Sequence, residues 1–263
     1  MQSITLSQGL LLALMSVIVG IDFWLEGLFI FRPIIVSTLT GLILGDVRLG
    51  LLAGGLTELT FAGLTPAGGT QPPNPVLAGV MTTVIAYTTG SHPEAAIGLA
   101  LPFSFLMQYI LLFYYSIFSL FMVKADKYAK EADVKAFTRL NIMPTIIVAV
   151  TYGVVVFLSA YVAQDAMRAL VSSMPVWLTH GLEVAGGILP AVGFGMLLRV
   201  MFKKEYTPYL IIGFLFASFI GFSNLLPVAL LGTALALYEF FNPKTSASTA
   251  NGSKEGDDYS DGI

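Results

Sequence analysis

The sequence contains no cysteine, only two histidines and few charged residues. Charged residues make up 11% of the 263 positions, whereas soluble domains carry about 25%. The absence of cysteine excludes disulfides, thiolate chemistry and cysteine-ligated metals. The two histidines, His92 and His180, are too far apart in the sequence to indicate a metal cluster. We therefore expect neither a metal nor a cofactor.

Apolar residues take the place of the missing charges. They make up 56% of the chain, and the mean hydropathy is +0.82. The small net charge of −3 arises mainly from acidic residues near the C-terminus, so nothing indicates a nucleic-acid partner. The N-terminus lacks a basic region and a small-residue cleavage site, and we expect it to remain in the mature protein. This composition predicts an integral membrane protein.

The apolar segments differ in length, and several are too short to cross a membrane. A bilayer core of about 30 Å requires roughly 20 apolar residues in a helix. Irregular backbone at membrane depth is tolerated only where protein or water satisfies its polar groups. We therefore predict an all-α integral membrane fold with multiple transmembrane helices, some broken or re-entrant around a substrate site. The candidate segments are 4–20, 27–44, 49–64, 76–90, 95–123, 142–163, 184–202, 207–221 and 224–241.

The distribution of basic residues predicts the topology. The stretches 123–141 and 199–206 are rich in Lys and Arg, which favours the cytoplasmic side for both. The segment between 164 and 183 then lies on the outer face, where His180 is better explained as an interfacial residue than as a catalytic one. We expect a membrane domain over 1–241, made of an N-terminal part to about 123, a cytoplasmic basic loop at 124–141 and C-terminal helices over 142–241. The polar tail 242–263 is predicted to be disordered.

Glycines recur at helix-contact spacing in the N-terminal third. Gly41 and Gly45 are four residues apart, as are Gly50 and Gly54. This spacing places both glycines of a pair on one helix face, where a partner helix can approach closely. We interpret these glycines as packing residues.

Acidic residues interrupt the apolar segments of the same region. Ionisable groups inside a membrane are costly unless paired, and they are therefore functional candidates. Asp22 and Glu26 would share a helix face, and Asp46 and Glu58 interrupt later segments. The structural alternative is a set of ion pairs, Glu26 with Arg32 or Asp46 with Arg48. Glu58 has no cation beside it in the sequence.

The stretch "LTELTFAGLTPAGGTQPPNPVLAG" (56–79) combines carboxylate and amide side chains with a Gly-Pro loop. Glu58, Thr65, Gln71 and Asn74 can donate and accept hydrogen bonds, as sugar hydroxyls require in a mostly apolar pocket. A buried Glu could also relay protons, so proton-driven transport stays open. The sequence has no catalytic constellation, and a phosphoryl-bearing histidine, if one is involved, must come from another chain.

Three stretches carry a resemblance to a known family. They are "GIDFWLEGLFIFRPIIVSTLTGLILGD", "GGLTELTFAGLTPAGGTQPPNP" and "LEVAGGILPAVGFGMLLRVMF". The chain resembles, over about residues 1–241, the IIC component of the mannose family of phosphoenolpyruvate-dependent sugar phosphotransferase (PTS) permeases. The stretches "FAGLTPAGGTQPPNP", "KADKYAKEADVKAFTRLN" and "DDYSDGI" are most similar to the N-acetylgalactosamine branch.

The resemblance implies partners and a mechanism. A IIC chain of this family pairs with a IID membrane subunit, and the heterodimers assemble as trimers in the bacterial inner membrane. The sugar binds in IIC, and a separate IIB protein with a phosphohistidine, supplied through IIA, phosphorylates its 6-hydroxyl. This chain would then be a non-catalytic subunit. Carried over by residue, Glu58, Thr65, Gln71 and Asn74 are the expected sugar ligands, with Asp22 and Glu26 as second choices.

Other functions stay open at this stage. The chain could be a proton-coupled sugar symporter, which would deliver unmodified sugar, or a scaffold beside a transporting partner. Within the PTS function, the substrate could be mannose, galactosamine or sorbose instead of N-acetylgalactosamine.

Overall fold

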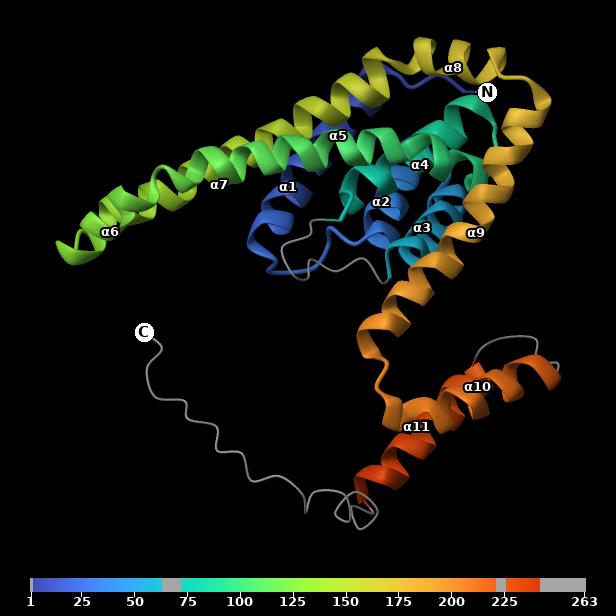
Figure 1. The fold of residues 1–263 in the computed structure, drawn as a ribbon. Helices are drawn as coiled ribbons and strands as arrows, with labels where there is room; N and C mark the ends of the chain where they lie inside the picture. Colours follow the sequence, from blue (N-terminus) through green and yellow to red (C-terminus); the bar gives the residue numbers. More distant parts are fainter. Residues whose placement is uncertain (1, 63–71, 221–225, 242–263) are drawn as a thin grey trace. The chain divides into compact units, whose positions relative to one another are not determined.

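The computed structural model describes residues 2–62, 72–220 and 226–241, and these residues are helical with short connections (Figure 1). The chain divides into two compact units, Met1–Val200 and Met201–Ile263, and each is described by itself. The helices are α1 (Leu6–Leu25), α2 (Pro33–Leu44), α3 (Val47–Phe61), α4 (Pro75–Thr89), α5 (Pro93–Ser119), α6 (Met122–Lys130), α7 (Val134–Phe157), a π-helix (Leu158–Val162), α8 (Gln164–Ser173), α9 (Val176–Met201), a 3-10 turn (Lys204–Tyr206), α10 (Thr207–Phe219) and α11 (Leu226–Phe241).

Local sequence signals explain where several helices begin and end. Thr5 and Gln8 form a capping box at the start of α1, and Asp46 caps α3 by accepting from the Leu49 amide. Proline occupies the first turn of α2, α4 and α5, where its missing N–H costs nothing. Gly45 and Gly90 end α2 and α4 in the left-handed conformation that glycine permits.

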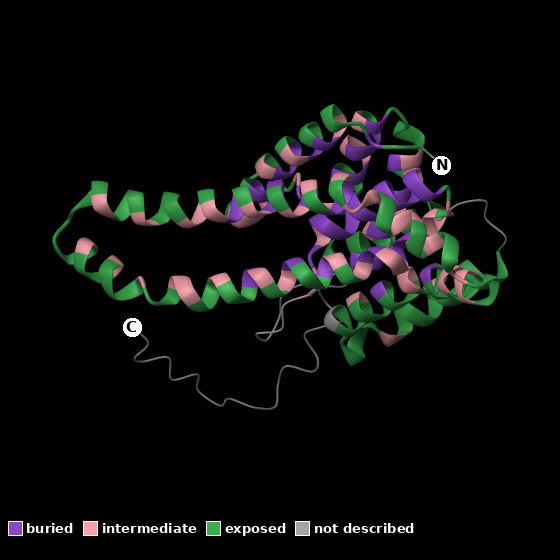
Figure 2. Ribbon diagram, turned by 90° about the horizontal axis from the view of Figure 1, so that it is seen from above, coloured by how far each residue is buried: buried purple, intermediate pink, exposed green. Residues whose placement is uncertain are grey.

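Helix α4 lies at the centre of the first unit. Every residue of α4 except Pro75 and Tyr87 is buried, and α5, α2 and α3 pack around it. Its threonine hydroxyls donate hydrogen bonds to backbone carbonyls of the preceding turn. The Thr82 hydroxyl, for example, donates to the Ala78 carbonyl oxygen at 2.7 Å. Figure 2 shows the buried residues gathered in this region, whereas residues 112–119 of α5 and 134–147 of α7 are exposed or half-buried.

Glycine contacts join α2 to α3, as the sequence spacing predicts. A Cβ added to Gly50 would lie 2.8 Å from the Cα of Gly41 and 2.5 Å from the Ser37 carbonyl oxygen. A Cβ added to Gly54 would lie 2.9 Å from the Ser37 Cβ and 3.0 Å from the Ile34 Cα. Gly45 is the exception, because it serves as the left-handed cap of α2 and faces open space.

The same kind of contact explains glycines in the stretch "GGILPAVG" of α9. A Cβ on Gly186 would collide with the Glu94 carbonyl at the start of α5, and a Cβ on Gly193 would lie 2.5 Å from the Leu59 and Thr60 carbonyl oxygens of α3. The two glycines are seven residues apart and so lie on one helix face. Helix α9 thus packs closely, through its backbone, against α3 and α5 of the same unit.

Helix lengths separate spanning from short helices. Four segments are long and apolar enough to cross a membrane: Leu6–Leu25, Pro93–Ser119, Val134–Val162 and Val176–Arg199. Helices α2, α3 and α4 have 12, 15 and 15 residues, too few to cross alone at about 1.5 Å per residue. This agrees with the predicted interruptions, and their re-entrant character stays a prediction.

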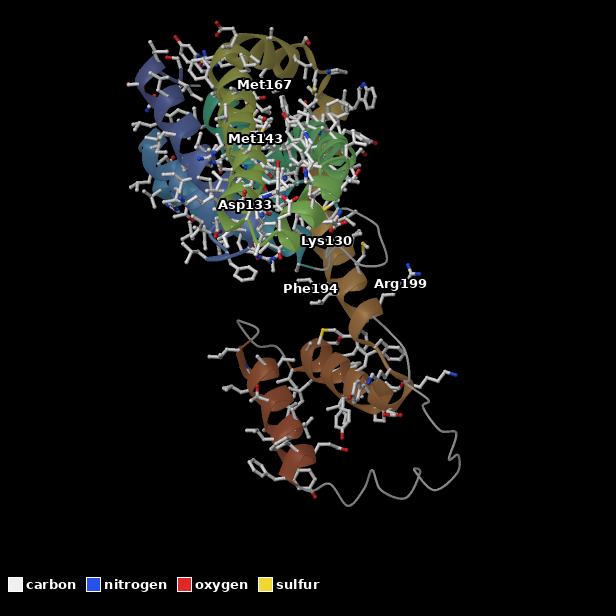
Figure 3. The ribbon with its side chains drawn as sticks, turned by 90° about the vertical axis from the view of Figure 1, so that its left-hand side faces the viewer. Lys130, Asp133, Met143, Met167, Phe194 and Arg199 are labelled. Carbon is white, nitrogen blue, oxygen red and sulfur yellow. The ribbon has the colours of Figure 1, made fainter. Side chains whose placement is uncertain are left out.

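The predicted basic loop 124–141 is helical instead. It contains most of α6, a short turn and the first third of α7 (Figure 3, where Lys130 and Asp133 mark the turn). Asp133 caps α7 by accepting from the Ala136 amide at 3.0 Å. Lys, Ala and Glu are strong helix formers, so the charge that predicts an aqueous location does not prevent a helix.

The N-terminal residues are tied to α8. Gln164 exchanges two hydrogen bonds with the backbone of Ile4, and Arg168 donates to the carbonyls of Gln2 and Thr88. Gln8 reaches the last carbonyls of α2 at 3.4 Å. One end of the unit, which we call the α8 end, therefore contains α8 together with the starts of α1 and α5 and the ends of α2, α4 and α7. Helix α6 marks the opposite end of α5 and α7, the α6 end.

The second unit contains α10 and α11. The Tyr209 hydroxyl donates to the Glu239 carboxylate between them. A cavity of 550 Å³ with mostly apolar walls lies along the same two helices. The predicted break at "GFSNLLP" and the predicted disordered tail fall largely or wholly on 221–225 and 242–263, outside the described residues.

Candidate functional site

A cavity of 320 Å³ lies where α1 and α3 end and where α2 and α4 begin, against the middle of α5. Its volume suits a small ligand. Its walls combine aromatic rings and prolines with a few polar groups. The lining residues are Phe23, Trp24, Glu26, Phe29, Phe31, Arg32, Pro33, Phe61, Pro72, Pro73, Asn74, Pro75, Gln108, Leu111 and Tyr115.

Aromatic pairs build one wall of the cavity. Trp24 stacks on Tyr115 with ring centroids 5.4 Å apart and planes 18° apart, which joins α1 to α5. Phe23 meets Phe31 edge to face at 5.3 Å, and Phe29 lies against Phe31. Such pairs restrict ring motion and add stability beyond the area they bury. The wall is therefore preorganised, with flat apolar faces beside the polar groups.

Asp22 fixes the loop that carries part of this wall. Its carboxylate accepts from the amides of Leu28 at 2.6 Å and Phe31 at 3.3 Å, and its side chain is buried. Within the loop, Glu26 and Phe29 have φ values of 49° and 59°, a conformation that costs free energy in residues other than glycine. The Asp22 bonds help to hold that conformation, so Asp22 acts on the cavity through the loop.

Glu58 pairs with Arg32, a contact that the sequence spacing does not indicate. The Arg32 Nε donates to Glu58 Oε1 at 2.8 Å, and Nη2 donates to the same oxygen. The other oxygen, Oε2, accepts from the Ile34 amide in the first turn of α2 at 3.2 Å. Glu58, which has no cation beside it in the sequence, therefore has one in the fold. Both alternative ion pairs fail, because neither Glu26 with Arg32 nor Asp46 with Arg48 forms one among the described residues.

Asn74 lines the cavity and joins several helices. Its Oδ1 caps α4 by accepting from Leu77 N at 3.0 Å, and its amide nitrogen donates to the Tyr152 hydroxyl of α7. Its backbone exchanges two hydrogen bonds with Ser104 of α5. A single residue thus links α4, α5 and α7.

These contacts set the depth of the cavity within the unit. Ser104, at the level of Asn74, lies about 16 Å along α5 from Pro93 at the α8 end and about 22 Å from Ser119 at the α6 end. The α5 residues that line the cavity, Gln108, Leu111 and Tyr115, all follow Ser104. The cavity therefore extends from mid-depth toward the α6 end.

The structure distributes the six predicted site residues over three groups. Glu26 and Asn74 line the cavity. Asp22 and Glu58 hold its walls by binding the loop and Arg32. Thr65 and Gln71 lie outside the described residues.

Sequence reasoning missed Arg32, Gln108 and the aromatic wall as parts of the site. Arg32 was considered only as an ion-pair partner, whereas the aromatic residues of α1 and α5 are indistinguishable in sequence from lipid-facing ones. Within the described residues, no group of three or more His, Asp or Glu side chains could hold a metal.

A multi-pass helical membrane protein with an aromatic-walled cavity that holds a few polar groups has the architecture of a small-solute permease. The family model described as "PTS system sorbose-specific iic component" matches residues 6–238. The chain therefore belongs to this family of IIC components of sugar phosphotransferase systems, and it is a multi-pass protein of the bacterial inner membrane.

Similar proteins agree with this assignment. The chain is 65% identical over 267 residues to the N-acetylgalactosamine permease IIC component 1 of Escherichia coli (strain K12), and the match covers 100% of both chains. It is 31% identical to the fructose permease IIC component of Bacillus subtilis (strain 168), over 92% of this chain and 90% of that one.

Two solved structures share the fold. One, titled "Structure of membrane protein", has a TM-score of 0.83 and 27% identity. The other, a cryoEM structure of the mannose transporter ManYZ in complex with microcin E492, has a TM-score of 0.57 and 28% identity. Each match covers 93% of this chain and 99% of the other.

Proposed function

We propose that this chain is the sugar-translocating IIC subunit of an N-acetylgalactosamine phosphotransferase permease. The observation that carries the proposal is the 65% identity over the full length of a relative with that name. Relatives named for fructose, sorbose and mannose are 28% to 32% identical. The difference in identity favours N-acetylgalactosamine over these sugars.

We propose that the sugar binds in the cavity beside Asn74. Glu26 offers a carboxylate and Asn74 an amide to the hydroxyls, and the rings of Trp24 and Phe31 offer apolar faces. Thr65 and Gln71 remain sequence-based candidates for further hydroxyls. Asp22 and Glu58 shape the site through the groups that they bind.

The direction of the cavity supports phosphorylation from the cytoplasm. Helix α6 carries Lys124, Lys127 and Lys130, and the start of α7 adds Lys135 and Arg139. The positive-inside rule places these residues in the cytoplasm, and the cavity extends toward them. A sugar in the cavity would therefore face a phosphorylated IIB protein, supplied by IIA. A IID subunit completes the proposed permease, in a trimer of IIC–IID heterodimers.

Uptake of radiolabelled N-acetylgalactosamine tests the function. Membrane vesicles would contain this chain with its IID partner, with and without phosphorylated IIB. We expect accumulation of the 6-phosphate only with phospho-IIB. Free sugar that is lost on addition of a proton uncoupler would instead identify a symporter, and inactivity with this sugar but activity with mannose would correct the substrate.

Substitution of Glu26 tests the site. Glu26→Gln should lower sugar affinity by about 10- to 100-fold, because a hydrogen bond to a charged group is lost. Gln71→Ala should also lower it, and both variants should still assemble with IID. Glu131→Gln is the matched control, since Glu131 lies exposed at the end of α6. Normal uptake by Glu26→Gln and Gln71→Ala would refute the site assignment.

A further inference from the structure

Arg32 is the cation of the cavity. Among the described residues no Lys and no other Arg lines it. The guanidinium binds Glu58 through Nε and Nη2, and Nη1 has no hydrogen-bond acceptor in the described part of the chain. The side chain is 40% exposed. One edge of the guanidinium is thus held by the protein, while the Nη1 side remains available to a ligand.

A neutral sugar does not require this cation. Its hydroxyls can be met by carboxylate and amide groups, which the cavity already offers in Glu26 and Asn74. A phosphoryl group differs, because it carries a charge of about −1.5 to −2 and three strong acceptor oxygens. Guanidinium edges match phosphate oxygens in a bidentate geometry, and such charge-assisted bonds are roughly twice as strong as neutral ones.

The position of Arg32 adds to its suitability for an anion. It is the N-cap residue of α2, and Pro33 at the first position of that helix also lines the cavity. The positive end of the α2 dipole therefore lies at the cavity, where it favours negative charge. Glu58 counteracts part of this field and keeps the guanidinium in place through two hydrogen bonds.

We propose that the free edge of Arg32 binds the phosphoryl group during and after its transfer to the sugar, and that Glu58 is the positioning residue that aims it. The proposal rests on the proposed function. In the transfer step, the sugar 6-hydroxyl oxygen forms a bond to phosphorus while the bond from phosphorus to the donor histidine nitrogen breaks. The bonding pair stays on that nitrogen, which takes up the proton that the hydroxyl loses, directly or through water. Arg32 compensates the negative charge that thereby moves from the histidine to the sugar.

The two partners of the ion pair have opposite effects on an anion in the cavity. Loss of the Arg32 charge weakens binding of the sugar 6-phosphate. Loss of the Glu58 charge removes a nearby like charge and strengthens that binding. If the ion pair had only a structural role, both substitutions would change the affinity for the 6-phosphate in the same direction. Opposite changes in that affinity therefore distinguish an anion-binding role from a structural one.

The experiment compares Arg32→Gln, Glu58→Gln and the control Arg48→Gln in the IIC–IID complex. Arg48 is an exposed residue in the first turn of α3 and lines no part of the cavity. Three quantities are measured: the Kd of N-acetylgalactosamine, the Kd of its 6-phosphate, and the single-turnover rate of transfer from phospho-IIB.

For Arg32→Gln we expect free-sugar affinity within about threefold of wild type, 6-phosphate affinity lower by about 10- to 100-fold and a transfer rate lower by about 100- to 1000-fold. For Glu58→Gln we expect 6-phosphate affinity higher by roughly three- to tenfold and a slower release of product. Arg48→Gln should match wild type in all three. Equal losses of free-sugar and 6-phosphate affinity in Arg32→Gln, or an unchanged transfer rate, would overturn the proposal.

The double variant Arg32→Gln, Glu58→Gln protects the test against misfolding. It removes the ion pair without leaving one charge unpaired, and it should show the transfer defect of Arg32→Gln. A double variant that transfers at the wild-type rate would refute the role of Arg32. Failure of the wild-type complex to bind the sugar at all would refute the proposed function instead, so the two failures are distinguishable.

Discussion

At the scale of single residues, the protein itself occupies most of the polar groups around the cavity. Asp22 binds two loop amides, Asn74 caps α4 and binds Tyr152, and Glu58 binds Arg32. A polar side chain in an apolar chain is therefore not necessarily a ligand contact. Here Asp22 and Glu58 place the loop and the Arg32 guanidinium that line the cavity.

Asp22→Asn tests this role. The amide can keep only one carbonyl acceptor for the two loop amides of Leu28 and Phe31, so a buried donor loses its partner. We expect the stability of the detergent-solubilised protein to fall by about 1–3 kcal/mol, measured by thermal or denaturant unfolding. Asp126→Asn is the control, because Asp126 is exposed on α6. Equal stability of the two variants would contradict the role of Asp22.

The sequence singles out polar residues that the structure places in or beside the cavity, but it does not give their partners. Asp22, Glu26, Glu58 and Asn74 are all recognisable as unusual in an apolar chain, and all lie in or beside the cavity. The pairing of Arg32 with Glu58 spans 26 residues and depends on how α2 packs against α3. Such long-range geometry is not encoded in local spacing.

At the scale of elements, glycine spacing explains how the short helices pack. Gly41 and Gly50 bring the backbones of α2 and α3 into contact, and a side chain larger than hydrogen does not fit between them. The sequence predicted that these glycines are packing residues, but not that Gly41 and Gly50 face each other. It also predicted a loop at 124–141, where the structure has helices, because charge reports the location of a segment in water and not its conformation.

Gly50→Ala measures the α2–α3 contact. The added methyl group would lie 2.5 Å from the Ser37 carbonyl oxygen, so the helices must separate. We expect a loss of about 1–3 kcal/mol in the free energy of unfolding. Gly55→Ala in the same helix faces open space and gains the same helix propensity, so it should be neutral or stabilising. A Gly50→Ala variant as stable as Gly55→Ala would show that the helices are not in contact here.

At the scale of the whole molecule, the bonds from α8 to the N-terminal residues bear on the side of the membrane at which the N-terminus lies. They place the N-terminus at the α8 end, opposite the basic residues of α6. If the basic residues are cytoplasmic, the N-terminus lies on the outer side of the membrane.

Single cysteines test this topology, since the natural chain contains none. In intact cells, Ser3→Cys and Ser173→Cys should react with a membrane-impermeant maleimide, whereas Lys130→Cys should react only after permeabilisation. All three side chains are exposed, so a difference in labelling would report the side of the membrane and not burial within the protein. Labelling of Ser3→Cys and Lys130→Cys from the same side would contradict the arrangement.

The unequal lengths of α1 and α5 bring the thickness of the lipid bilayer into the behaviour of this protein. Helix α1 has 20 residues, enough for a core of about 30 Å, whereas α5 has 27 residues and is about 40 Å long. Both cannot stand upright in the same bilayer, so α5 must tilt by roughly 40° or project into the headgroup region. Acyl-chain length would then bias the angle of α5 relative to α1, and with it the wall that Trp24 and Tyr115 share. A permease of this design is sensitive to hydrophobic mismatch at the very contact that shapes its cavity.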